Sequence, residues 1–88
     1  MEIRYSSEAE NDLAIIKKNG TPVTKKRLER ILKDILEHPY TGFASPEELK
    51  HNLSGKWSRE LSKKDRVIYN IEDDALQIYS LLGHYADK

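Results

Sequence analysis

An acid, a cation and an imidazole occur in that order in the second half of this 88-residue chain: Glu47, Arg66 and His84, with Tyr85 directly after the histidine. A carboxylate can accept a proton, a guanidinium can stabilise negative charge, and an imidazole can return a proton. These groups are the parts needed to cleave a phosphodiester by acid–base chemistry without a metal ion. Cleavage of RNA is therefore the leading hypothesis.

The balance of charge weighs against binding of nucleic acid by bulk electrostatics. Lys and Arg total 15 and Asp and Glu total 15, which gives a net charge of zero. The segment from Lys56 to Arg66 nevertheless carries five basic side chains against two acidic ones. We expect local positive potential in this segment. A second basic cluster, between residues 25 and 33, falls on a predicted helix and is interpreted as a solvated face.

Size and composition predict one domain that spans residues 1–88. The chain has no cysteine, so we expect neither a disulfide framework nor a thiolate zinc site. His38 and His51 have no partners at ligand spacing, and we expect no metal and no cofactor. The first residues lack the features of a signal peptide, and no apolar run approaches the ~20 residues that cross a bilayer. The sequence predicts a cytoplasmic protein that does not bind membranes.

The first half of the chain predicts one strand followed by two helices. Ile3 and Tyr5 alternate like a strand, and Ser7 has the spacing to Glu10 of a capping box. We expect this helix to end at Asn19-Gly20, residues that tolerate left-handed backbone. A second helix is expected from Thr21-Pro22 to His38-Pro39, with a strong apolar period of Leu28, Ile31, Leu32, Ile35 and Leu36.

The second half predicts an irregular segment and then three strands. Residues 40–55 are rich in turn formers, with a helical turn expected at Pro46–Leu49. The strands are expected at Lys56–Leu61, Arg66–Ile71 and Ala75–Leu82, joined by short turns in an antiparallel meander. The order β-α-α-β-β-β predicts an α+β fold of two layers, with both helices packed on one face of the sheet.

Strand pairing tests whether the candidate residues can meet. If the last hairpin turns at Glu72–Asp74, Ile71 opposes Ala75 and Arg66 opposes Ser80. The side chains of Arg66, Ser80 and His84 would then lie on the same side of the sheet. A slip of one residue would move His84 to the opposite face.

The most specific motifs lie within residues 46–69. They are the words Leu53-Ser54-Gly55, Trp57-Ser58-Arg59 and Arg66–Tyr69, and the chain adds His84-Tyr85 near its end. In these words the sequence resembles the Txe/YoeB family of bacterial toxin–antitoxin toxins, within the RelE/ParE superfamily. The resemblance covers most of the chain and implies the RelE/ParE-like fold.

The resemblance also implies an activity and its partners. Toxins of this family are ribosome-dependent messenger-RNA interferases, endoribonucleases that cut the codon in the ribosomal A site by attack of the ribose 2′-hydroxyl on the neighbouring phosphate. The implied partners are a cognate antitoxin protein, the 70S ribosome with its mRNA, and a second copy of the chain in a homodimer. Operator DNA would be reached only through the antitoxin complex.

Five functional positions of the family have a match in this sequence. The resemblance implies the general base at Glu47, a phosphate contact at Lys50, the transition-state arginine at Arg66, the general acid at His84 and the neighbouring tyrosine at Tyr85. A glutamate is ionised at neutral pH and can accept a proton, and a histidine can donate one there. Such acid–base help contributes roughly 10²–10⁴-fold to a rate.

Each of these residues also has a structural interpretation. Glu47 and Glu48 after a proline could begin a short helix, where negative charge favours the dipole. Lys50 could be an ordinary surface lysine, and Arg66 could pair with Glu60 across two strands, a contact worth ~0–1 kcal/mol when exposed. His84 and Tyr85 could be an exposed histidine and a cover for the sheet edge. We interpret Arg59 as a substrate-binding residue that contacts phosphate.

The chain departs from the family pattern at a few positions. Glu60 stands where relatives carry a second arginine, Leu82 and Gly83 replace a basic and an aromatic residue, and residues 86–88 follow the tyrosine. These departures favour an alternative function, a catalytically weak or inactive protein that acts with its antitoxin as a co-repressor. A second alternative is inhibition of gyrase, as in the ParE branch, but retention of both the acid and the imidazole favours the nuclease.

Overall fold

The computed structural model describes residues 1–83. In chain order the elements are β1 (Glu2–Tyr5), α1 (Ser7–Asn19), α2 (Pro22–Glu37), β2 (Glu47–Glu48), the 3₁₀ helix η1 (His51–Leu53), β3 (Trp57–Glu60), β4 (Arg66–Glu72) and β5 (Ala75–Gly83). No helix in this described part of the chain is long and apolar enough to cross a membrane.

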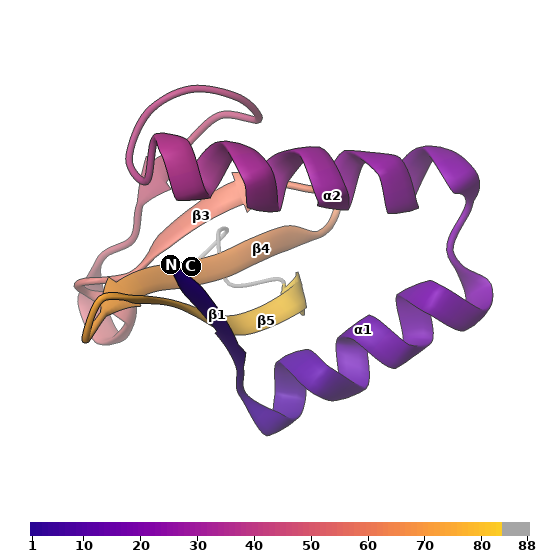
Figure 1. Cartoon of the computed structure of the whole chain (residues 1–88), viewed down its shortest axis with the longest axis horizontal. Coiled ribbons are helices and arrows are strands. Elements are labelled where there is room, and N and C mark those ends of the chain that lie inside the picture. Colours follow the sequence, from indigo (N-terminus) through magenta and orange to yellow (C-terminus); the bar gives the residue numbers. More distant parts are fainter. Residues whose placement is uncertain (84–88) are drawn as a thin grey trace.

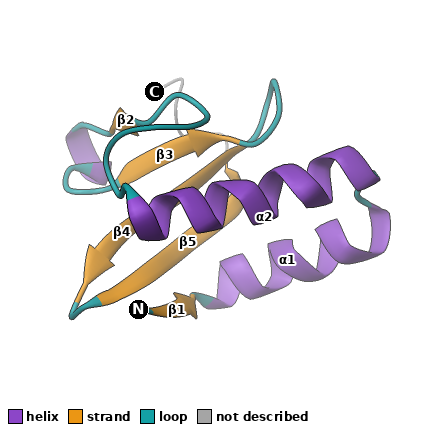
Figure 2. Ribbon diagram, turned by 45° about the horizontal axis from the view of Figure 1, so that its top comes forward, coloured by secondary structure: helices purple, strands orange, loops and turns teal. Residues whose placement is uncertain are grey.

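The strands form one sheet in the order β1-β5-β4-β3-β2. The three strands β3, β4 and β5 are antiparallel neighbours, as predicted, whereas β1 pairs with β5 in parallel, so the whole sheet is mixed. Both helices pack on one face of the sheet (Figures 1 and 2). The predicted two-layer α+β fold is confirmed, and the structure adds the two-residue edge strand β2 to the predicted order.

Helix α1 is capped one residue earlier than predicted. The backbone N–H of Ser6 still donates to the carbonyl of Ile78 at 3.0 Å, so the extended chain of β1 continues through Ser6. The Ser6 hydroxyl accepts from the N–H of Ala9 at 3.0 Å and is the N-cap. The prediction that Ser7 caps the helix was wrong because strand pairing, which the local motif does not encode, extends to Ser6.

The end of α1 at Asn19 agrees with the prediction, but the role of Gly20 differs. Its backbone is extended, at φ −72° and ψ 150°, rather than left-handed. Its N–H donates to the carbonyl oxygen of Ile16 at 2.7 Å, and a Cβ at this position would stand 2.5 Å from that oxygen. Close approach of backbone, not positive φ, therefore requires the glycine.

Helix α2 has the limits that the sequence predicted. The Thr21 hydroxyl accepts from the N–H of Thr24 at 3.1 Å, Pro22 occupies the first turn, and the helix ends at Glu37 before His38. Its apolar stripe packs against the sheet, and the fully buried members are Leu28, Ile31 and Ile35.

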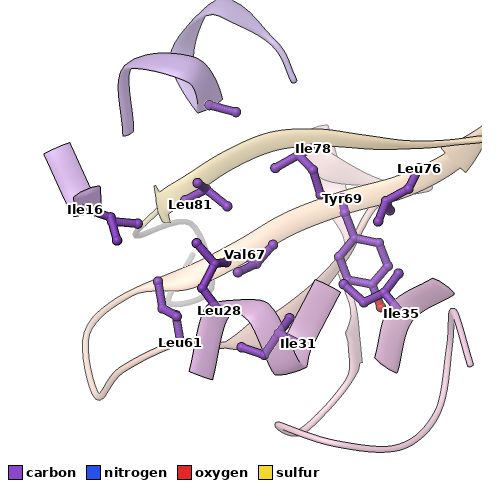
Figure 3. Close-up of a cluster of buried hydrophobic side chains, with 11 residues drawn as sticks. Ile16, Leu28, Ile31, Ile35, Leu61, Val67, Tyr69, Leu76, Ile78 and Leu81 are labelled. Carbon is purple, nitrogen blue, oxygen red and sulfur yellow. The ribbon is translucent and has the colours of Figure 1, made fainter. Parts of the chain in front are cut away.

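The core lies between the helices and one face of the sheet (Figure 3). The strands and the residue directly after β3 contribute Leu61, Val67, Tyr69, Leu76, Ile78 and Leu81 to it. Full burial of an aliphatic side chain of this size stabilises by about 1.5–3 kcal/mol, so this face is committed to packing. Polar chemistry must therefore use the opposite face of the sheet or its edges.

The β4–β5 hairpin turns over two residues rather than three. Asp73 and Asp74 both have left-handed backbone, at φ 54° and 59°, which is the signature of a type I′ turn. Glu72 consequently pairs with Ala75 and Ile71 with Leu76. The predicted pairing of Ile71 with Ala75 was wrong by one residue, because aspartate accepts positive φ more readily than the prediction allowed.

Two irregularities between β4 and β5 shift the register further along the hairpin. Ile68 lies opposite Ser80, and Arg66 lies opposite Gly83. The predicted pair of Arg66 with Ser80 was therefore wrong. The shift moves Arg66 opposite the residue that immediately precedes His84 in the chain.

Asp12 of α1 completes the hydrogen bonding at the far end of β5. Strand β1 pairs with β5 only as far as Ile78, so the later backbone of β5 has no strand on that side. The Oδ2 atom of Asp12 accepts from the N–H of Leu81 at 2.9 Å and from that of Leu82 at 3.1 Å. Because Asp12 is buried, this carboxylate replaces a missing strand at two consecutive amides.

We expect Asp12→Ala to lower the free energy of unfolding by about 3 kcal/mol, because it leaves the buried amide of Leu81 and the partly buried amide of Leu82 without an acceptor. Asp12→Asn keeps an acceptor oxygen and should lose less than half as much. Urea unfolding of both variants measures the difference. Equal losses for the two variants would contradict the role of the carboxylate as an acceptor.

Candidate active site

Glu47 lies on the edge of the sheet, not on a helix. It pairs with Ser58 and Glu48 pairs with Trp57, so the chain adds a short strand to the outer edge of β3. The next residue, Leu49, is buried and donates its N–H to the carbonyl of Lys56 at 2.9 Å. The predicted helical turn at Pro46–Leu49 was wrong, because pairing with β3 satisfies the same backbone groups in an extended conformation.

The Arg66 guanidinium meets Glu47 across the end of β3. Its Nη2 atom lies 3.6 Å from Oε1 of Glu47 and donates to the carbonyl of Ser45 at 2.7 Å, and its Nε donates to the hydroxyl of Ser58 at 2.7 Å. The side chain of Arg66 is 16% exposed and that of Glu47 is 57% exposed. A largely covered cation held by two neutral acceptors therefore lies beside a half-exposed carboxylate.

The structural alternative for Arg66 was an ion pair with Glu60. The two residues are cross-strand partners, as that interpretation required. The ion pair that Arg66 forms within residues 1–83 is nevertheless with Glu47. The backbone of Glu60 binds other groups, because its carbonyl accepts from Nε of Arg27 at 3.0 Å and its N–H donates to Ala44 at 2.8 Å.

Lys50 and Leu82 have contrasting positions. Lys50 is exposed and directly precedes η1, three residues after Glu47, so its ammonium is available to a bound anion on the same edge.

Leu82 is partly buried and packs against the hydrophobic core. Leu82 therefore serves packing rather than an exposed active surface.

Arg59 does not occupy a surface position. Its side chain is 0% exposed, and each of its five N–H groups has an acceptor. Nε donates to the Tyr69 hydroxyl at 3.1 Å, Nη1 to Asp34 Oδ2 and the Phe43 carbonyl at 2.7 Å each, and Nη2 to the carbonyls of His38 at 2.5 Å and Thr41 at 2.9 Å. No donor remains for a phosphate, so the structure does not support Arg59 as a substrate-binding residue.

The buried guanidinium instead shapes the loop of residues 38–45. The Tyr69 hydroxyl adds a bond to the Pro39 carbonyl at 2.5 Å. Gly42 has φ 107°, and a Cβ there would lie 2.5 Å from Oδ2 of Asp34, so only glycine lets the loop close over this carboxylate. The loop ends with left-handed backbone at Ala44 and Ser45 and presents the Ser45 carbonyl to Arg66.

Asp34 supplies the negative charge that balances Arg59. Its Oδ2 also accepts from the N–H of Phe43 at 3.0 Å. The hydrogen bond from Arg59 and then that from Phe43 hold the pKa of Asp34 below its ordinary value of 3.8. The carboxylate is therefore ionised wherever the protein is folded near neutral pH.

Three contributors to the site were not predicted from sequence: the Ser45 carbonyl, the Ser58 hydroxyl and Asp34. Ser58 could have been predicted. Strand alternation puts its side chain on the same face as that of Glu60, and Glu60 lies opposite Arg66. No pattern in the sequence indicates the role of the Ser45 carbonyl, because that role depends on a left-handed backbone conformation at Ser45. No pattern indicates Asp34 either, because its partner Arg59 lies 25 residues away in the sequence.

His84 and Tyr85 lie outside the described residues. The last described residue, Gly83, is the Cα partner of Arg66 in the sheet. Among residues 1–83 no group of three or more His, Cys, Asp or Glu side chains could hold a metal ion. The described part of the site thus comprises Glu47, Arg66, and the exposed Lys50 nearby.

Comparison with known proteins gives a consistent result over nearly the whole chain. Residues 5–85 match the model of a family described as the YoeB-like toxin of bacterial type II toxin–antitoxin systems. Toxin YoeB from Escherichia coli O6:H1 (strain CFT073) is 36% identical over 85 residues, which cover 97% of this chain and 100% of that protein.

Solved structures share the fold. A YoeB dimer from Staphylococcus aureus is 30% identical, with a TM-score of 0.87, and a heterotetrameric YoeB–YefM toxin–antitoxin complex from the same species has a TM-score of 0.85 at the same identity. Each alignment covers 97% of this chain and 98% of the other. A YoeB/ParE toxin from Agrobacterium tumefaciens is 20% identical with a TM-score of 0.90, over 97% and 100% of the two chains, and shares the fold.

We expect Asp34→Asn to destabilise the protein by about 2 kcal/mol at pH 7, because it leaves a buried guanidinium without its counter-charge while the carboxylate itself is partly exposed. The lowered pKa of Asp34 means that its stabilising effect is present above pH 4 and is lost as the pH falls through the folded-state pKa. Urea unfolding at pH 7 and pH 3 should therefore show a large difference between wild type and variant that shrinks in acid.

Asp73→Asn is the matched control for this pH series, because Asp73 is exposed in the hairpin turn and asparagine also accepts its positive φ. It should match wild type at both pH values. A difference for Asp34→Asn that stays the same from pH 7 to pH 3 would show that charge is not what Asp34 contributes.

Proposed function

Because this chain belongs to the YoeB-like toxin family of bacterial type II toxin–antitoxin systems, we propose that it is a ribosome-dependent endoribonuclease that cuts messenger RNA at the A-site codon. The observation that carries this proposal is the solvent-facing pair of Glu47 and Arg66, 3.6 Å apart on the edge of the sheet. One group accepts protons and the other stabilises anionic phosphate, and in-line cleavage of RNA needs both side by side.

The first half of the reaction uses Glu47 as the general base. Its carboxylate takes the proton of the ribose 2′-hydroxyl while the 2′-oxygen attacks the adjacent phosphorus. The half-exposed position of Glu47 suits this role, because a substrate can reach the carboxylate from solvent. Lys50 on the same edge contacts a non-bridging oxygen of the phosphate.

Arg66 stabilises the pentacoordinate phosphorane. Nε is held by Ser58, while Nη2 is held by Ser45. These two acceptors are neutral and fix the orientation of the guanidinium before substrate arrives, and its positive charge is shared between Glu47 at 3.6 Å and the phosphate. Such preorganised charge is commonly the largest single contribution of an active site to rate.

The second half of the reaction needs an acid for the leaving group. We assign this role to His84, which donates a proton to the 5′-oxygen as the P–O bond breaks, with Tyr85 next to it. The assignment rests on the family motif that His84-Tyr85 matches; the last described residue, Gly83, is the Cα partner of Arg66 in the sheet. The products are a 2′,3′-cyclic phosphate and a 5′-hydroxyl, and every proton is accounted for.

Regulation by a protein antitoxin and self-association follow from the family. The Staphylococcus aureus YoeB structures include a dimer and a heterotetramer with the antitoxin YefM. We assign this chain a cognate antitoxin and a homodimeric form on that basis. The ribosome and its bound mRNA supply the substrate.

Single-turnover cleavage on programmed ribosomes tests the proposal. We expect wild-type protein to cut the A-site codon and Glu47→Gln and His84→Ala each to reduce the rate at least tenfold, since each removes one proton-transfer group. Glu48→Gln is the matched control for Glu47, because both are exposed residues of β2; it should retain the wild-type rate.

Intact messenger after incubation with wild-type protein would refute the nuclease. Ribosome binding without cleavage would then indicate the decayed co-repressor, and inhibition of gyrase would indicate the ParE-like activity.

A further inference from the structure

A hollow of ≈ 390 Å³ that neither Glu47 nor Arg66 lines has no part in the mechanism described above. Its walls come from five elements or their flanks, and the lining residues are Ser6, Ser7, Glu8, Leu53, Lys56, Ile68, Tyr79 and Ser80. Its size is at the small end of the range for sites that bind small molecules, about 300–1,000 Å³. A single nucleoside is a more fitting occupant than a helix of a protein partner.

Strand pairing connects the hollow to the active site. Ile68 of β4 lies between Ser58 of β3 and Ser80 of β5, and directly paired residues share a face. Ser58 is the residue that accepts from Arg66, so the row from Ser58 to Ser80 runs across the same face as the catalytic guanidinium. Ile68 lies two residues from Arg66 on one strand, a distance of about 7 Å.

Ser80 gives the hollow a polar group that no protein group satisfies. Ser80 is 1% exposed, and its hydroxyl is the one buried side-chain oxygen or nitrogen among the described residues without a hydrogen-bond partner. Buried hydroxyls are normally paired, because an unpaired one loses its bonds to water. A ligand with a donor or acceptor on a flat edge would complete it.

Lys56 and Tyr79 form a wall that combines a cation with an aromatic ring. The Lys56 ammonium lies 4.5 Å from the centroid of the Tyr79 ring. The Tyr79 hydroxyl donates to Glu72, which holds the ring in place. Aromatic faces stack on bases and ammonium groups bind phosphates, so this wall has the chemistry of a nucleotide site.

We propose that this hollow is a subsite for the substrate nucleotide next to the scissile bond, with its base over Ile68 and against Tyr79, its edge bonded to the Ser80 hydroxyl and its phosphate near Lys56. This inference rests on the proposed nuclease function and names a part of the substrate that Glu47 and Arg66 do not contact.

Binding of an uncleavable RNA tests the subsite without any cleavage. The probe is a trinucleotide with a 2′-deoxy sugar at the position of attack, titrated into the full chain while backbone amide NMR shifts are recorded. We expect saturable shifts at Ile68, Tyr79 and Ser80, a Kd at least fivefold weaker for Ser80→Ala and at least tenfold weaker for Ser80→Leu, which fills the hollow. Shifts confined to other residues, or variants that bind like wild type, would overturn the proposal.

Two comparisons separate this effect from a loss of folding or of bulk charge. Ser80→Ala removes a hydroxyl with no protein partner, so its unfolding midpoint in urea should equal or exceed that of wild type. Lys56→Gln should weaken trinucleotide binding at least threefold, whereas Lys17→Gln, at an exposed position in the last turn of α1, should leave it unchanged. If both lysine variants weaken trinucleotide binding equally, the loss of binding is due to net charge alone, and the proposed subsite is overturned.

The ribosome assay distinguishes failure of the subsite from failure of the nuclease. Wild type that binds the trinucleotide in the hollow but never cuts messenger would refute the nuclease and leave the nucleotide site. Ser80→Leu that cuts at the wild-type rate would refute the subsite and leave the nuclease. Ser80→Leu that binds the trinucleotide normally but loses a peptide of the cognate antitoxin would assign the hollow to the antitoxin and overturn the proposal.

Discussion

The burial of one guanidinium is the constraint on which the rest of the site depends. Arg59 lies under the end of α2 with no exposed surface, and a buried cation is tolerated only when it is paired and fully hydrogen-bonded. Asp34 provides the charge and the loop of residues 38–45 provides three carbonyls. The loop therefore has little freedom, and its last residue, Ser45, meets Arg66 at a fixed place. The buried Arg59 thus positions the more exposed Arg66 through the loop, without a direct contact between the two.

The two faces of the sheet have different tasks, and this division explains where function lies. One face is packed by α1 and α2 and contains the apolar core (Figure 3). The other carries Ser58, Arg66, Ile68 and Ser80 in paired positions that run across three strands. The rigid sheet fixes the distances between these side chains, so the Arg66 guanidinium and the hollow lined by Ile68 and Ser80 share one surface without a flexible loop between them.

Sequence predicted the helices well and the hairpins less well, for physical reasons. The limits of α2 follow from two local signals, a proline in the first turn and a proline after the end, and both were read correctly; the structure adds the cap by Thr21. The register of β4 on β5 depends on a two-residue turn and on irregularities that leave no mark in the alternation of residues. Glu47 and Arg66 were chosen correctly as neighbours. Arg59 was not, because an arginine in a strand looks the same whether its partner is a phosphate or a carboxylate distant in sequence.

The parallel pairing of β1 with β5 has a consequence for the order in which the elements of the chain can fold. Glu2 pairs with Ala75, so β1 has no strand beside it until β5 has been synthesised. Contacts so far apart in sequence form late in folding. During translation the apolar stripes of α1 and α2 have no complete sheet to cover, and the Arg66 strand has no β5 beside it. The five-stranded sheet, and with it the surface that holds Glu47 and Arg66, is therefore complete only once β5 has joined it.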